Sequence, residues 1–335
     1  VMTFKFNYMS QMNDIKNYFA ALIIGKNVID TLQNTIESVR PYCTQIVYVD
    51  TGSDDGTPEL AAKLGAELYF FKWNNNFSEA RNFGLTFIRT DWVLSIDSDE
   101  VFIGDNLSNY SNFIQNQSVG GLTVNIKNYI NPSDLSNYTI HKYTRIFRKD
   151  SSIRFTGKIH EQIRDSIENK GLEIINTEIY IEHFGYLNNN PEKQQRNLYL
   201  LNEELQNDDN NIFIKYHLAS TEFSMGDFLN AKKHFQDILD SPLLSLEQNE
   251  LVRIHLAQIA LNNNLFEDVN NLLSYNFELK ENQALRIFIL AAVNMITHNF
   301  EKAKELYENP ILQSSSSIDK AIVNQALEII NSIQL

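Results

Sequence analysis

Residues 45–57 read QIVYVDTGSDDGT, and this stretch decides the fold class. Its first five residues are mostly β-branched or aromatic and have the length of a buried strand. Turn residues follow, and then Thr57, Pro58 and Glu59 predict a helix start, with threonine at the N-cap and proline at N1. A strand that leads through a glycine-bearing turn into a helix predicts an α/β domain.

The same alternation continues on both sides of this stretch. Strands are expected at 18–24, 45–49, 66–71 and 92–96, and helices at 28–39, 57–65 and 78–88, the second of them stopped by Gly65. This spacing predicts a mostly parallel sheet covered on both faces. Further strands at 121–129, 139–148 and 173–182 would extend it as a mixed sheet.

From Asn190 onward the pattern becomes helical, and a repeat appears. Each copy has a Leu-Ala pair, a turn residue and three spaced apolar residues, with offsets of 38 and then 34 residues. The copies are Leu218-Ala219, Gly226, Phe228, Ala231, Phe235; Leu256-Ala257, Asn264, Phe266, Val269, Leu273; and Leu290-Ala291, His298, Phe300, Ala303, Tyr307. Length and spacing predict tetratricopeptide-like helical pairs, and a generic helical bundle is the alternative.

Length, composition and charge limit the number of domains and the partners to expect. A chain of 335 residues and 38.7 kDa predicts two main domains, which we place at 18–189 and 190–335 after an N-terminal extension at 1–17. The net charge of −14 disfavours nucleic acid or an anionic membrane as partner. One cysteine, Cys43, excludes an internal disulfide framework. No signal peptide or membrane-length apolar run is recognised, so a soluble cytoplasmic protein is expected.

Acidic residues follow two of the predicted strands. Ligands of open α/β sheets bind beyond the carboxyl ends of strands, so we expect Asp50 to contact a ligand, whereas Asp54 and Asp55 are expected to order the turn. Asp97 and Asp99 follow the strand WVLSI and could both face one hard cation that bridges phosphate oxygens. Taken alone, an Asp-x-Asp arises easily by chance in so acidic a chain.

Between these clusters, a helix begins at residues 76–82, NFSEARN. Its free N–H groups and Arg81 suit a phosphate, although Arg81 could equally pair with an acid of the clusters. The chain has no G-x-G-x-x-G and no Walker loop, and it lacks the glycine-rich opening of nucleotidyltransferases. Dinucleotide oxidoreductases and P-loop enzymes therefore lose support.

Together, IIGKN, VDTGSDDGT, FSEARNFGL and DWVLSIDSDE resemble inverting family 2 glycosyltransferases with the GT-A fold. The later segments YTRIFR, GKIHE and HFGY, followed by the repeats, resemble the repeat-fused branch that includes bacteriocin S-glycosyltransferases. Val28 departs from the family, whose members usually carry an acid there. The resemblance implies a UDP-sugar donor, Mg²⁺ or Mn²⁺ at Asp97 and Asp99, and donor-nucleotide contacts at Ile24, Asn27, Asp50, Gly52, Arg81 and Ser98.

Inverting transfer also needs a base to take the proton of the acceptor. We favour Glu161, with His160 as the rival, because both follow a glycine that permits close approach; Glu100 is expected to point elsewhere. His183 could complete the metal shell or contact phosphate, and a structural role is its alternative. Arg145 and Arg148 are expected to share a strand face and to neutralise diphosphate or acceptor acids, or to form ion pairs.

The sequence thus predicts a hexosyltransferase that moves a sugar, glucose by resemblance, from UDP to a Cys or Ser/Thr side chain of a peptide such as a bacteriocin precursor. The repeats are expected to hold the peptide or protein acceptor. Two alternatives stay open: a transferase for polysaccharide or lipid-linked acceptors, and a peptide-binding scaffold with a degenerate transferase domain. The oligomeric state, a homodimer included, is also left open.

Overall fold

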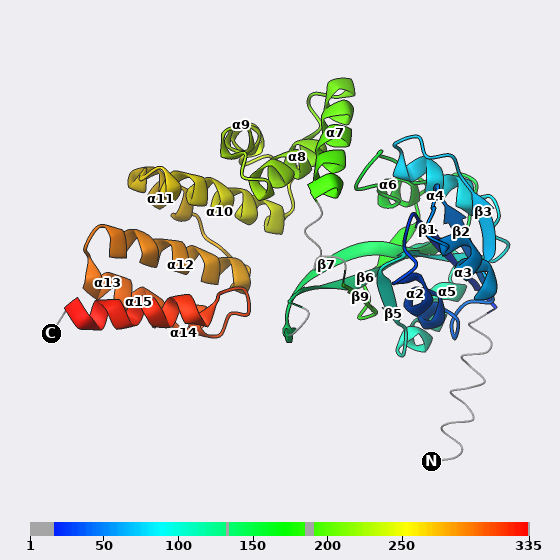
Figure 1. Cartoon of the computed structure of the whole chain (residues 1–335), viewed down its shortest axis with the longest axis horizontal. Coiled ribbons are helices and arrows are strands. Elements are labelled where there is room, and N and C mark those ends of the chain that lie inside the picture. Colours follow the sequence, from blue (N-terminus) through cyan, green and yellow to red (C-terminus); the bar gives the residue numbers. More distant parts are fainter. Residues whose placement is uncertain (1–16, 132–133, 185–190, 334–335) are drawn as a thin grey trace, which may run out of the picture. The chain divides into compact units, whose positions relative to one another are not determined.

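The computed structural model describes residues 17–131, 134–184 and 191–333 (Figure 1). Its Cα positions group into two compact units, one up to residue 189 and one from residue 190. Most of the expected N-terminal extension, together with Asn190 and the last two residues of the HFGY segment, lies outside the described residues.

The N-terminal unit is built on one nine-stranded mixed sheet. Its parallel half has the order β3-β2-β1-β4, and its other half continues as β7-β6-β9-β5, with β8 beside β6. The strands are β1 (Phe19–Gly25), β2 (Gln45–Asp50), β3 (Glu67–Phe70), β4 (Trp92–Asp97), β5 (Glu100–Ile103), β6 (Val119–Asn131), β7 (Asp134–Arg148), β8 (Glu173–Ile175) and β9 (Tyr180–His183). The expected parallel sheet with a mixed extension is confirmed.

Helices cover both faces of this sheet. One core contains side chains of α2 (Leu32–Val39), α3 (Thr57–Lys63), the 3₁₀ turn η1 (Leu107–Tyr110) and α5 (Ser111–Gln115); the other contains those of α4 (Phe77–Leu85) and α6 (Arg164–Glu168). Successive strand residues enter opposite cores: Leu22 packs on the α4 side and Ile23 on the α2 side. Burial on both faces explains why β1, FAALIIG, is an uninterrupted apolar run up to its last residue.

The helix expected at 28–39 begins only at Leu32. The preceding turn is bound to the loop after β2 instead: the Val28 N–H donates to Thr57 Oγ1 at 3.0 Å, and Asn27 has a left-handed φ of 54°. Thr57 is the first residue of α3 rather than its N-cap, which is Gly56 with φ 87°. Side-chain hydrogen bonds to the neighbouring loop outweigh helix propensity here.

The single strand expected at 173–182 forms two strands, β8 and β9. Between them, buried Thr177 interrupts the ladder, because its hydroxyl donates to the Thr123 carbonyl at 2.6 Å. A side-chain bond of this kind competes with strand pairing.

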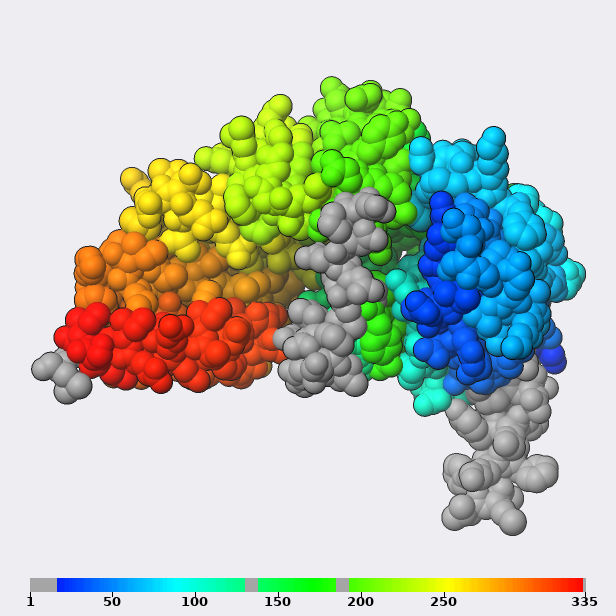
Figure 2. Space-filling model, in the orientation of Figure 1, coloured from blue at the N-terminus to red at the C-terminus, as the bar shows by residue number. Residues whose placement is uncertain are grey.

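The C-terminal unit is all-helical in its described residues. Its helices are α7 (Pro191–Asn207), α8 (Ile212–Ser224), α9 (Phe228–Ile238), α10 (Leu246–Asn262), α11 (Phe266–Leu273), α12 (Lys280–Ile296), α13 (Phe300–Tyr307), α14 (Pro310–Gln313) and α15 (Lys320–Ile333). Within this unit, α10 to α13 form packed layers, coloured yellow to orange in Figure 2.

The repeat predicted from the sequence is confirmed by its backbone. The equivalent turn residues Gly226, Asn264 and His298 all have left-handed φ angles, of 82°, 57° and 61°. The first alanine of each copy is fully buried, so paired helices approach closely there. The predicted fold class, an α/β domain followed by helical tetratricopeptide-like repeats, is therefore confirmed. In the part of the chain that the structure describes, no helix combines the length and apolar character needed to cross a bilayer.

Candidate active site

The acidic strand ends predicted from the sequence lie at one edge of the sheet. In the register of the parallel strands, Gly25 is paired with Asp50, and Ile24 with Asp97. β1 therefore lies between the two aspartates, and both strands end beside it. This is the edge at which open α/β sheets bind ligands.

A residue of α2 holds the turn after β4 in place through hydrogen bonds. The buried Thr35 hydroxyl lies 3.0 Å from the Ser98 carbonyl oxygen and 2.7 Å from that of Glu100. The Asp97 N–H donates to Glu100 Oε2 at 2.8 Å across the same turn. These bonds hold the four residues from Asp97 to Glu100 in a compact arrangement.

Arg81 is the centre of a buried charge network. It lies on α4, whose N-cap Asn76 accepts a hydrogen bond from the Glu79 N–H at 3.0 Å. Only 3% of Arg81 is exposed, and its guanidinium pairs with Asp97 and Glu161 and donates to Ser95 Oγ at 3.0 Å. The pairing with a cluster acid, which the sequence left open, is thus present.

Glu161 reaches Arg81 because its segment is docked on α4. The Asn82 side chain exchanges two hydrogen bonds with the backbone of Phe155, both at 2.9 Å. At the start of the same helix, the Phe77 N–H donates to the Lys158 carbonyl at 2.8 Å. The side chain of Glu161 is 12% exposed, so the carboxylate is largely enclosed and fixed in direction.

Arg145 joins the network from β7. Its Nη2 lies 3.0 Å from Asp97 Oδ2 and 3.1 Å from Glu100 Oε1. We expected Glu100 to point away from the site, and that expectation was wrong. Glu100 is buried beside Asp97. Burial alone would raise the pKa of Asp97, but Arg145 and Arg81 outweigh it and hold that pKa well below its usual range. Burial raises the pKa of Glu100 to about 7, although Arg145 opposes the shift.

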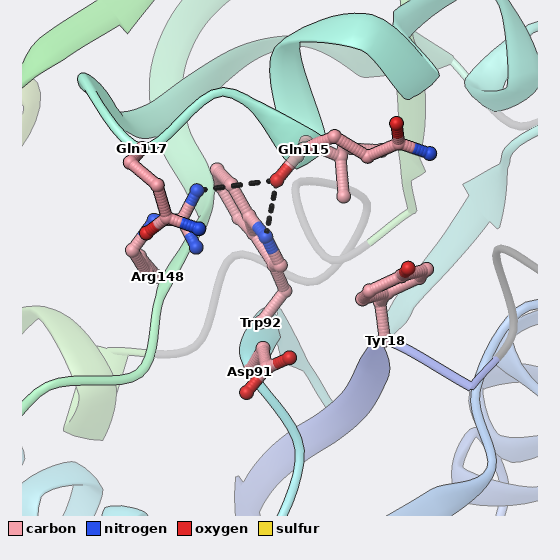
Figure 3. A pocket seen from close by; sticks show the side chains of 7 residues that line it. Tyr18, Asp91, Trp92, Gln115, Gln117 and Arg148 are labelled. Carbon is pink, nitrogen blue, oxygen red and sulfur yellow. Dashed lines mark hydrogen bonds between the residues drawn. The ribbon is translucent and has the colours of Figure 1, made fainter.

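Arg148 does not share a face with Arg145, and that expectation was wrong. Residues three apart on a strand point to opposite faces. Arg148 lies over the Trp92 ring, 4.7 Å from its centroid, and binds backbone carbonyls, among them that of Ile114. Figure 3 shows that Trp92 donates to the same carbonyl and that Arg148 borders a separate pocket with Tyr18 and Asp91. Trp92 begins β4, so this pocket lies at the opposite end of that strand from Asp97.

The three expected metal ligands do not form one cluster. Among the described residues, no group of three or more His, Cys, Asp or Glu side chains could hold a metal ion. Both Asp97 oxygens are bound by arginines, whereas Asp99 Oδ2 lies 3.5 Å from His183 Nε2. His183 Nδ1 lies 2.8 Å from Asn128 Oδ1, and this contact orients the ring. Burial lowers the pKa of His183, but the hydrogen bond and the charge of Asp99 outweigh burial and raise that pKa.

The expected donor-binding residues at the ends of β1 and β2 have different roles. Asp50 is 1% exposed; its Oδ1 accepts hydrogen bonds from the N–H groups of Gly52 and Ser53, at 2.8 and 2.9 Å. Its Oδ2 has no partner among the described residues. Gly52 adopts φ 109°, which this turn requires. A buried carboxylate oxygen without a donor is a position where a ligand N–H can bind.

The other expected donor contacts help to build the edge of the sheet. Ile24 is buried in the core on the α4 side. Asn27 ties two loops together, since its Oδ1 accepts from the Asp54 N–H at 2.9 Å. Ser98 is 7% exposed, and a Cβ added at Gly25 would lie 3.1 Å from its Oγ and 2.7 Å from Tyr48 Oη. Glycine at 25 is therefore required by close packing.

Asp55 orders the turn, as expected. It accepts hydrogen bonds from the N–H groups of Thr57 and Ile29, at 3.0 and 3.3 Å. His160, the rival base, is half-buried with a left-handed φ of 52°, and burial lowers its pKa although Glu161 opposes this.

Three residues that contact the candidate site were not predicted from the sequence. Ser95 could have been found, because it lies two residues before Asp97 and therefore on the same strand face. Thr35 and Asn128 give no local signal, since each contacts the site from a distant segment.

Residues 21–178 match the model of the family described as Glycosyl transferase family 2. The SPbeta prophage-derived glycosyltransferase SunS of Bacillus subtilis is 26% identical over 242 residues, which cover 65% of this chain and 56% of that protein. A TPR repeat-containing protein of Synechococcus elongatus is 28% identical over 145 residues, 43% of this chain and 35% of that protein.

Among solved structures, S. aureus TarS 1-349 has a TM-score of 0.39 and 15% identity, covering 88% of this chain and 90% of that one. The chain spans less than two thirds of the length of SunS and of the Synechococcus elongatus protein. The match over residues 21–178 includes the acidic strand ends, Arg81, Arg145 and Glu161. Residues 21–178 of the N-terminal unit thus match a glycosyl transferase family 2 domain.

Proposed function

We propose that this protein is an inverting hexosyltransferase that moves a sugar from a UDP-sugar, glucose in the first instance, to a Cys, Ser or Thr side chain of a peptide. One observation carries this proposal beyond the family match. Arg81 holds Glu161 beside Asp97, although the two acids are far apart in the sequence. A carboxylate is thereby fixed at the edge of the sheet where a donor sugar would bind.

In this reaction the acceptor thiol or hydroxyl attacks the anomeric carbon of the sugar. The new bond forms as the bond from that carbon to the UDP oxygen breaks, and the acceptor proton passes to a base. Glu161 is our candidate for the base, because its Oε1 is held by Arg81 and no described residue binds its Oε2. His160 is adjacent and remains the alternative.

The uracil base is proposed to bind near Asp50. The buried Oδ2 of Asp50 has no donor in the described residues, and the N3–H of uracil would supply one. Arg81 and Arg145 would act on the donor indirectly, by holding Asp97 in place, since both are committed to carboxylates. Ser98, Gly52 and Ile24 would shape this site largely through their backbone positions, and Asn27 through the bond from the Asp54 N–H to its Oδ1.

A divalent cation, Mg²⁺ or Mn²⁺, fits Asp99 and His183. Both side chains are half-buried, and the contact with Asn128 orients the His183 ring beside Asp99. When bound, such a cation neutralises charge on the leaving diphosphate. Asp97 is then a positioning residue rather than the metal ligand predicted from the sequence. The mutual position of Asp99 and His183 is what supports this assignment.

The tetratricopeptide-like repeats are proposed to bind the peptide acceptor. Stacked helical pairs commonly present extended surfaces that hold polypeptide segments. The relative SunS is described as a glycosyltransferase, which supports sugar transfer as the reaction of the present chain.

The proposal is tested by incubating the full chain with UDP-glucose, Mn²⁺ and a peptide that contains cysteine and serine. Mass spectrometry should show a peptide heavier by one hexose, and fragmentation should identify the modified atom. Glu161→Gln should abolish most transfer, and exposed Glu305→Gln is the matched control. Transfer that is equal in both variants would refute the assignment of the base. A panel of UDP- and GDP-sugars in thermal-shift assays identifies the donor.

A further inference from the structure

The C-terminal unit contains a second polar site, remote in sequence from the sheet edge. A pocket of about 330 Å³ lies where α11 ends and the chain leads into α12. Tyr275, Asn276 and Phe277 line it from the connecting segment, and Gln283 and Arg286 line it from α12. The pocket lies wholly within the C-terminal unit, and nothing in the proposed sugar transfer uses it.

Arg286 is the unusual member of this pocket. Its Nε donates to the Leu273 carbonyl at 2.6 Å, which fixes the guanidinium at the end of α11. Among the described residues, Nη1 and Nη2 have no hydrogen-bond partner, and no carboxylate pairs with the side chain. By contrast, Arg253 in the same unit is paired with Asp240.

The absence of a described acid beside Arg286 is informative because the chain carries 42 acids against 28 bases. Burial lowers the pKa of Arg286, and no described negative charge opposes that shift. Arg286 is half-buried, so its guanidinium has lost part of its hydration, and a ligand that supplies a negative charge would compensate for that loss. The pocket therefore favours an anionic ligand.

The other residues of the pocket limit which kind of anion it can bind. Gln283 Nε2 donates to the Phe277 carbonyl at 2.5 Å, which orders the connecting segment, and the Phe277 ring lies 5.9 Å from the Arg286 guanidinium carbon. Arg286 is the one cation among the residues that line the pocket, and amides and aromatic rings make up most of the rest. A single guanidinium with neutral polar neighbours matches a monoanion such as a carboxylate better than a phosphate dianion.

We propose that this pocket binds a carboxylate of the acceptor peptide through a two-point hydrogen bond with the Nη groups of Arg286. The carboxylate belongs either to an acidic side chain or to the peptide C-terminus. The identity of the partner as a peptide rests on the proposed function, whereas the carboxylate chemistry rests on the pocket. The pocket would then give the repeats a charge-specific anchor for the acceptor.

The test titrates the full chain, without donor, with three small probes, and follows the Arg286 Nε–Hε signal by NMR. N-acetylglycine carries a terminal carboxylate, N-acetylglutamate α-methylamide carries a side-chain carboxylate, and N-acetylglutamine methylamide is neutral. At least one carboxylate should shift the signal with a Kd on the order of millimolar, and the neutral probe should not. The responding carboxylate identifies the source. Equal shifts with the neutral probe, or none with either carboxylate, would overturn the proposal.

Two variants make the test specific. Because Arg286→Gln removes the signal followed above, the variants are compared by the side-chain amide of Asn276, which lines the same pocket and should also shift with carboxylate in the wild-type chain. Arg286→Gln should lose this response, whereas Lys302→Gln, which removes the same charge from an exposed pair with Glu305, should keep it. If Arg286→Gln does not fold, Arg286→Lys decides the question: it keeps the charge but not the planar fork, and should bind roughly tenfold more weakly. Unchanged affinity in Arg286→Lys would contradict two-point binding.

These outcomes are separate from those that test sugar transfer. A protein that binds carboxylates but transfers no sugar would refute only the proposed function. If transfer occurs with the same KM for an acidic peptide and its carboxamide analogue, the transferase stands and this pocket is not an acceptor anchor.

Discussion

Replacing Arg81 by methionine tests whether the charge network organises the N-terminal unit. The change keeps much of the apolar length of the side chain but removes the only guanidinium that links Asp97 to Glu161 among the described residues. Loss of one partner from a buried ion pair costs about 3–5 kcal/mol, because a buried charge is left uncompensated. The side chain of Asp97 is 36% exposed, so we expect a value near the lower limit.

The assay is thermal unfolding followed by tryptophan fluorescence. Both tryptophans, Trp73 and Trp92, lie in the N-terminal unit, so the signal reports that unit rather than the repeats. A loss of about 3 kcal/mol predicts a fall in Tm of roughly 6–12 °C for a unit of this size.

The matched control is Arg89→Met. Arg89 is paired with Glu67, but its side chain is 66% exposed, so its loss should lower Tm much less than the loss of Arg81 does. If Arg81→Met lowers Tm no more than Arg89→Met does, the network is not a buried organising element and the reasoning fails. A double-mutant cycle with Glu161→Gln should give a coupling of about 0.5–3 kcal/mol.

Three further predictions concern the base, the cation and the repeats. Glu161→Gln should lower transfer by roughly 10²–10⁴ while UDP-sugar affinity stays unchanged in calorimetry; a near-normal rate, with loss in His160→Ala, would assign the base to the histidine. Asn128→Ala should weaken Mn²⁺ binding about 10–100-fold, because His183 loses the bond that directs Nε2; unchanged Mn²⁺ affinity would argue against this ligand. His298→Gly should stabilise the helical unit by about 1 kcal/mol in denaturant unfolding followed by circular dichroism, since φ 61° favours glycine; a lower midpoint would contradict this.

The strand ends were the most predictable part of the site. Apolar runs of strand length place Asp50 and Asp97 at the ends of parallel strands, and parallel strands end at a common edge. The helical repeat was equally accessible, because its small residues and turn positions recur at nearly constant spacing. Local periodicity carried both predictions.

What depends on contacts between distant segments was not predictable in detail. The pairing of Arg81 with Glu161 requires the docking of residues 155–162 on α4, and no local pattern encodes that contact. The late start of α2 likewise comes from hydrogen bonds to the loop after β2. The placement of Arg148 is different in kind, because the two-residue period of a strand puts residues three apart on opposite faces and therefore separates it from Arg145.

We propose that the edge of the sheet around Asp50, Asp97 and Glu161 transfers sugar to a peptide. The most direct test of this proposal is mass spectrometry of a cysteine- and serine-containing peptide after incubation with the full chain, UDP-glucose and Mn²⁺. We expect a peptide heavier by one hexose with the wild-type chain and strongly reduced product with Glu161→Gln. Absence of any modified peptide across a panel of UDP- and GDP-sugars, with the donor sugars also left unhydrolysed, would contradict the proposal.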